Sequence, residues 1–164
     1  MEKDLVALLL SLILFHGFWG LILYKFGMTR SISKSYYLFD NKWTFVIGTL
    51  LYALPIFFVE HQWLRYAGVF LMLVAAAPAG RAKGLEGWMH VIGAWGAIVC
   101  GLIFVALQGI EGSRPEKIIY WGLIIVYLGF VVWATNKPLK NHTTYIEVAA
   151  VDLILGVAIV NQIV

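Results

Sequence analysis

The sequence predicts an all-α fold: an integral membrane bundle of six transmembrane helices, in which the second and third helices are short and form a hairpin. Of the 164 residues, 62% are hydrophobic and only 13% are charged, whereas roughly a quarter of a soluble domain is charged. Six apolar stretches alternate with short polar connections, and the lysines and arginines gather at the ends of these stretches. We therefore expect residues 1–164 to form a single transmembrane helical domain.

Four of the stretches approach the length of roughly 20 residues that crosses a bilayer. They are residues 5–25, 87–109, 118–135 and 143–164. The first follows the nearly neutral residues 1–4, whereas a signal peptide begins with basic residues, so it is interpreted as the first membrane helix.

The remaining two stretches, residues 43–59 and 64–79, fall short of that length and share the polar turn 60–63. Each contains a proline, Pro55 or Pro78, and proline bends or ends a helix because it lacks the backbone N–H. These features predict a short helical hairpin. Whether its two helices fully cross the bilayer stays open at this point.

The distribution of basic residues predicts the orientation of the six spans. The first, third and fifth connections carry eight of them: Lys25, Arg30, Lys34, Lys42, Arg81, Lys83, Lys137 and Lys140. The N-terminus and the second and fourth connections carry four: Lys3, Arg65, Arg114 and Lys117. Because cytoplasmic loops are enriched in lysine and arginine, we expect the odd-numbered connections to be cytoplasmic and both termini to lie outside the cell membrane.

Small residues on the fourth stretch predict close helix packing. Gly93, Ala97 and Gly101 recur every fourth residue and share one helical face, which lets a second helix approach closely in lipid. Gly122 and Gly129 suggest a similar role on the fifth stretch. Packing alone is a sufficient explanation for these positions.

Two acids in the last apolar stretch are the main indication of function. Glu147 and Asp152 lie in a span, where ionisable residues are costly and commonly mark a functional site. At about 100° per residue they project about 140° apart, so they do not form a carboxylate dyad. Asp152 lies at the same predicted depth as His16, and Glu147 lies at the depth of His90. We therefore expect two separate pairs, of which the first could carry protons.

A serine-rich segment lies on the predicted cytoplasmic side, near Glu147. Residues 29–37 read Thr-Arg-Ser-Ile-Ser-Lys-Ser-Tyr-Tyr. Ser31 and Ser33 are candidate binding residues, because their hydroxyls could close over an internal polar site. Alternatively, the serines only cap a short interfacial helix.

Three features in sequence order carry a resemblance to a known group. They are the turn Ser31-Ile32-Ser33-Lys34-Ser35, the run Ala-Ala-Ala-Pro-Ala-Gly at 75–80, and a helix that opens with Trp88-Met89-His90. Over residues 29–97 the chain resembles uncharacterised bacterial and phage polytopic proteins related to the FRAG/DRAM/Sfk group. The resemblance implies six helices and singles out Ser31, Ser33 and His90, but it implies no settled activity. The chain is also distantly similar to alkaline-ceramidase-like zinc hydrolases, but it lacks the paired C-terminal histidines of that group.

Composition and motifs narrow the function classes. The net charge of +3 is spread over several connections, which favours membrane lipids as partners and not nucleic acid. The single cysteine, Cys100, excludes an internal disulfide, and no motif predicts a metal or cofactor. Three hypotheses remain. The first is a membrane protein with a protonatable or lipid-binding internal site, in transport, permeation or lipid handling. The second is a structural subunit, which could form a homo-oligomer, and the third is an intramembrane lipid hydrolase.

Overall fold

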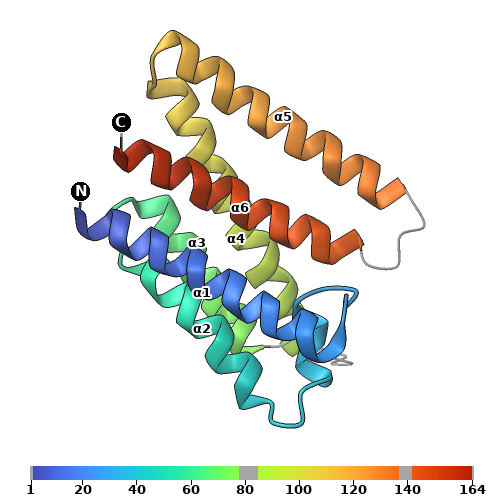
Figure 1. The fold of residues 1–164 in the computed structure, drawn as a ribbon. Coiled ribbons are helices and arrows are strands. Elements are labelled where there is room, and N and C mark those ends of the chain that lie inside the picture. The colour runs from blue at the N-terminus through green and yellow to red at the C-terminus, as the bar shows by residue number, and fades with distance from the viewer. Residues whose placement is uncertain (1, 78–84, 137–141, 164) are drawn as a thin grey trace.

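The computed structural model describes residues 2–77, 85–136 and 142–163, which form six α-helices, one short 3-10 helix and no strand (Figure 1). The elements are α1 (Glu2–Phe26), η1 (Ser33–Tyr37), α2 (Trp43–Phe57), α3 (Gln62–Ala76), α4 (Leu85–Glu111), α5 (Arg114–Asn136) and α6 (His142–Ile163). The predicted all-α class and the order of the helices are confirmed. Pro78 and the basic residues Arg81, Lys83, Lys137 and Lys140 lie outside the described residues.

Helix length separates two groups. Helices α1, α4, α5 and α6 are long and apolar enough to cross a membrane. The helices α2 and α3 have 15 residues each, or about 22 Å at the usual helical rise, against a hydrocarbon core of about 30 Å. Pro55 lies inside α2, which ends at Phe57, as expected for a residue that cannot continue the hydrogen-bond ladder. The predicted shortness of the second and third helices is confirmed.

The helices run back and forth between two ends of the bundle (Figure 1). At the end that holds both termini, the Asp4 carboxylate accepts a hydrogen bond from the Glu60 backbone N–H in the α2–α3 turn, at 3.1 Å. At the same end, the Tyr120 hydroxyl near the start of α5 donates to Asn161 near the end of α6. The segment 27–42 lies at the opposite end, with the beginning of α6.

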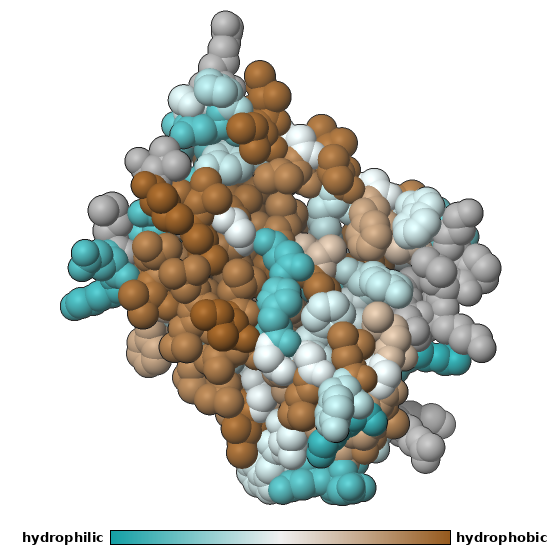
Figure 2. All heavy atoms as spheres, viewed as in Figure 1, coloured by the Kyte–Doolittle hydropathy of each residue, from teal (hydrophilic) through white to brown (hydrophobic). Residues whose placement is uncertain are grey.

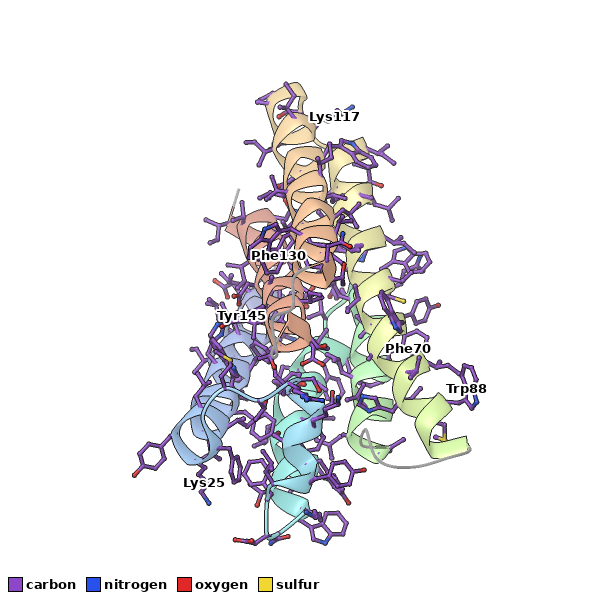
Figure 3. The ribbon with its side chains drawn as sticks, turned by 90° about the vertical axis from the view of Figure 1, so that its right-hand side faces the viewer. Lys25, Phe70, Trp88, Lys117, Phe130 and Tyr145 are labelled. Carbon is purple, nitrogen blue, oxygen red and sulfur yellow. The ribbon has the colours of Figure 1, made fainter. Side chains whose placement is uncertain are left out.

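The side-chain view makes the two ends visible. Lys25 at the end of α1 and Lys117 at the beginning of α5 lie at opposite ends of the bundle, and Trp88 points away from it (Figure 3). Trp88 is exposed, as is usual for an aromatic side chain near a membrane interface.

Helix α4 uses its small residues to admit two neighbours. A Cβ atom on Gly93 would lie 2.8 Å from the Phe70 backbone oxygen of α3, and one on Gly101 would overlap the Ile154 side chain of α6. Ala97, between them, is buried. Because small residues let helix backbones approach in lipid, this ridge explains why α4 lies against both α3 and α6. The prediction of a packing face on the fourth stretch is confirmed.

The corresponding expectation for α5 is wrong. A Cβ atom on Gly122 or Gly129 would meet nothing within 4 Å in this chain. Helix α5 lies at the edge of the bundle (Figure 1) and contacts chiefly α4 and α6. Its glycines face away from these two helices.

The two kinds of glycine predict different responses to substitution. We expect Gly93→Leu to lower the free energy of unfolding by roughly 1–3 kcal/mol, because the new side chain meets the rigid backbone of α3. Gly122→Leu is the matched control. Its new side chain meets open space, so the free energy of unfolding should stay nearly unchanged. Thermal unfolding of both variants in the same detergent measures the difference. Equal midpoint shifts would contradict the assignment of the α4 ridge.

Candidate functional site

An apolar pocket of about 90 Å³ lies inside the bundle, lined by residues of α1, α2, α3, α4, α6 and the segment 27–42. One water needs about 10–15 Å³ by a comparable measure, so the pocket has room for several waters or a stretch of alkyl chain. Its apolar walls include Phe15, Leu64 and Leu155. Among the described lining residues, the polar side chains are Ser33, Tyr52 and Glu147.

Glu147 supplies the acidic group of this pocket. It lies in the second turn of α6 and is half-buried. Its Oε2 accepts a hydrogen bond from the Ile32 backbone N–H at 2.6 Å, and its Oε1 accepts a longer one from the Ser33 hydroxyl at 3.4 Å. A carboxylate removed from water needs such donors. In the part of the chain that the structure describes, no lysine or arginine forms an ion pair with it.

The same carboxylate joins two segments that are far apart in the sequence. Ile32 immediately precedes η1, and its N–H points at α6. One turn before Glu147, the buried Thr144 donates its hydroxyl to the Thr29 carbonyl at 2.7 Å and its N–H to the Arg30 carbonyl at 3.2 Å. The beginning of α6 therefore holds the segment 29–33 against one end of the pocket.

The predicted serines lie in this segment but have different partners. Ser31 is buried, and its hydroxyl accepts the Lys34 N–H at 3.1 Å, a local turn contact. Ser33 is also buried and donates to Glu147. Ser31 thus serves the backbone of the segment, whereas Ser33 and Glu147 share the pocket.

The predicted Glu147–His90 pair is wrong. The His90 ring is buried, and its Nδ1 lies 2.8 Å from the Ala77 carbonyl oxygen at the end of α3. Glu147 has its own donors in the segment 29–33. The beginning of α4 packs on α3, so His90 points to that helix and not to α6.

The predicted His16–Asp152 contact is confirmed. The His16 Nε2 and the Asp152 Oδ1 are 3.2 Å apart, between the middle of α1 and the middle of α6. The two side chains are 41% and 47% exposed, so the expectation that this pair is internal is wrong. A short hydrophilic patch lies near the middle of the face on which α1 and α6 lie, with a largely apolar surface on one side of it (Figure 2).

The other ring nitrogen of His16 contacts its own helix. Its Nδ1 lies 3.0 Å from the Leu12 carbonyl oxygen, which only accepts hydrogen bonds, so this geometry places a proton on Nδ1. The contact leaves Nε2 to face Asp152 and holds the ring beside the carboxyl group.

The chemistry of the remaining groups is limited. The described residues contain no cluster of three or more His, Cys, Asp or Glu side chains that could hold a metal ion.

The sequence did not indicate the roles of the Ile32 amide and Thr144, because a backbone donor has no signature in the sequence and a threonine at the beginning of a helix is common. Comparison of the chain with family models, curated proteins and solved structures found no match.

The fold lowers the pKa of one histidine that lies outside the four long helices. His61, in the α2–α3 turn, packs edge-on against Phe104 with ring centroids 4.7 Å apart. Its buried Nδ1 has no hydrogen-bond partner among the described residues. Burial lowers the pKa of His61 below its ordinary 6.5, and the negative charge of Glu111 partly opposes this.

Because the folded state disfavours protonated His61, we expect stability to fall as the pH drops below about 6.5, where the unfolded chain binds the extra proton. At higher pH the histidine is neutral in both states and has no such effect. His61→Phe should remove this part of the dependence. Thermal midpoints of both proteins between pH 8 and pH 5 test it. Parallel profiles would show that His61 does not contribute.

Proposed function

We propose that the protein is a multi-pass protein of the cell membrane that binds a single-chain amphiphile in the pocket, in lipid transport or handling. The carrying observation is the position of Glu147: a carboxylate at one end of an apolar pocket, held by two donors and without an ion-pair partner among the described residues. An apolar pocket with a few placed polar groups is the usual form of a small-molecule site.

The chemistry of the pocket favours a cationic head on this ligand. Lys34 acts on Glu147 electrostatically but is exposed and forms no ion pair with it. A carboxylate in low-dielectric surroundings gains most from a close opposite charge. A primary amine would complete the hydrogen bonds of Oε1, which the Ser33 hydroxyl contacts only at 3.4 Å. The apolar tail would then lie between Phe15 and Leu155.

The proposed topology places the polar end of the pocket at the cytoplasmic side. All six helices cross the membrane in this proposal, with α2 and α3 as short spans and both termini outside. Lys25, Arg30 and Lys34 are exposed around the segment 27–42, which agrees with the positive-inside rule. These cations would also hold the segment at the level of the lipid headgroups.

Binding of two matched probes tests the proposal. The full chain in lipid nanodiscs is titrated with hexadecylamine and with hexadecanol, and bound probe is counted by native mass spectrometry. We expect Glu147→Gln to weaken amine binding at least about tenfold, because it removes the opposite charge. The glutamine oxygen still accepts the Ile32 N–H, so alcohol binding should change little.

Asp152→Asn is the control, since it makes the same chemical change on the same helix outside the pocket. It should leave the binding of both probes unaltered. Failure of the wild-type chain to bind the amine, or equal loss of amine in both variants, would refute the assignment of the pocket.

A further inference from the structure

The face formed by α1 and α6 has two properties that this chain alone does not explain. The first is the His16–Asp152 pair, half-exposed at mid-helix. The second is a set of open glycines around it. Gly17 and Gly20 on α1 and Gly156 on α6 would carry a Cβ that meets nothing within 4 Å in this chain.

These glycines do not improve packing within the single chain. A glycine in a helix interior costs about 1 kcal/mol relative to alanine, and here no neighbour in this chain requires the missing Cβ. Gly20 follows His16 by four residues and Gly156 follows Asp152 by four, so each lies on the same helical face as its polar residue. Polar side chains next to small residues are typical of helix surfaces that meet another helix in lipid.

The pair also has a cost that a covering partner would reduce. In lipid, half-exposed histidine and aspartate side chains lose the hydrogen bonds that water would supply. Among the described residues, the second carboxylate oxygen of Asp152, Oδ2, has no partner. The outer face of α5 provides a contrast, because around its open glycines it presents exposed apolar residues such as Ile125 and Val126.

We infer that the α1/α6 face binds a second copy of this chain, with the His16–Asp152 pairs of the two copies side by side at the centre. The argument for a second copy is charge complementarity. His16 lies in the middle of α1 and Asp152 in the middle of α6, so the pair is a dipole that points from one helix to the other, across the helix axes. A two-fold axis along the membrane normal turns the second dipole antiparallel to the first. His16 of one copy then faces Asp152 of the other.

Such an arrangement satisfies the conditions of a closed two-fold interface. The same patch is used on both copies and is self-complementary, as isologous dimers require. The basic ring of one copy faces the acidic group of the other in low dielectric, where electrostatic attraction is strong. Gly20 and Gly156 let the helices approach until the pairs meet. This inference does not depend on the ligand of the pocket.

Counting subunits in a bilayer tests the inference with glycine variants. Full-length protein with one fluorophore is reconstituted at low density into phosphatidylcholine vesicles, and bleaching steps are counted. We expect two steps for wild type and for Gly129→Leu, and mostly single steps for Gly20→Leu. Both leucines point into space that is open in the single chain, so a monomer tolerates both. Asp152→Asn, nearly isosteric, should lower the dimer fraction at least about tenfold.

Cysteine crosslinking supplies an independent readout on the folded protein. In a Cys100→Ala background, Ile13→Cys lies one turn before His16 on the exposed side of α1, and Val126→Cys lies on α5. The Ile13 variant should form a disulfide-linked dimer on oxidation, and the Val126 variant should not. Single bleaching steps for the wild type, a dimer insensitive to both Gly20→Leu and Asp152→Asn, or equal crosslinking at the two sites would overturn the inference.

Discussion

The hydrogen bond from the Ile32 N–H to the Glu147 carboxylate connects the last helix of this protein to the segment after the first. It closes one end of a bundle whose ends in sequence are also neighbours in space, since α1 and α6 lie together (Figure 1). Thr144 strengthens the junction by holding the carbonyls of Thr29 and Arg30. Without this junction the Ile32 N–H would lose its acceptor, and the Thr29 and Arg30 carbonyls would lose the donors of Thr144, at a cost of roughly 1–3 kcal/mol for each unsatisfied buried group.

The position of one helix gives its two acids different environments. Glu147 faces the pocket and the segment 29–33, whereas Asp152 faces outward and meets His16. Among the residues that the structure describes, no lysine or arginine forms an ion pair with either acid, and each acid has a different kind of partner. Glu147 accepts hydrogen bonds from a backbone N–H and a hydroxyl, and Asp152 lies beside the His16 imidazole. In our account the first acid serves a ligand, and the second serves an interface.

Much of the fold could be predicted from the sequence because lipid restricts the choices. Apolar length indicated the long helices, and Pro55 with the polar turn indicated the short hairpin. Helical phase separated Glu147 from Asp152 correctly, and equal depth brought His16 to Asp152. The predicted pairing of His90 with Glu147 was wrong, because equal depth in the membrane does not determine which helices are neighbours. The α4 ridge packs its first glycine on α3, and this turns His90 toward Ala77. The same limit applies to Gly122 and Gly129, whose spacing cannot show whether a partner is present.

Amide hydrogen exchange at Ile32 tests the central claim most directly, because the Ile32 N–H is the donor that binds the Glu147 carboxylate and so joins the segment 29–33 to α6. In lipid nanodiscs we expect Glu147→Leu to accelerate exchange at Ile32 at least about tenfold, as the loss of one buried acceptor implies. Glu147→Gln, which keeps an acceptor oxygen, should remain close to the wild type. Unchanged protection of Ile32 in Glu147→Leu would contradict the claim that Glu147 holds this end of the pocket closed.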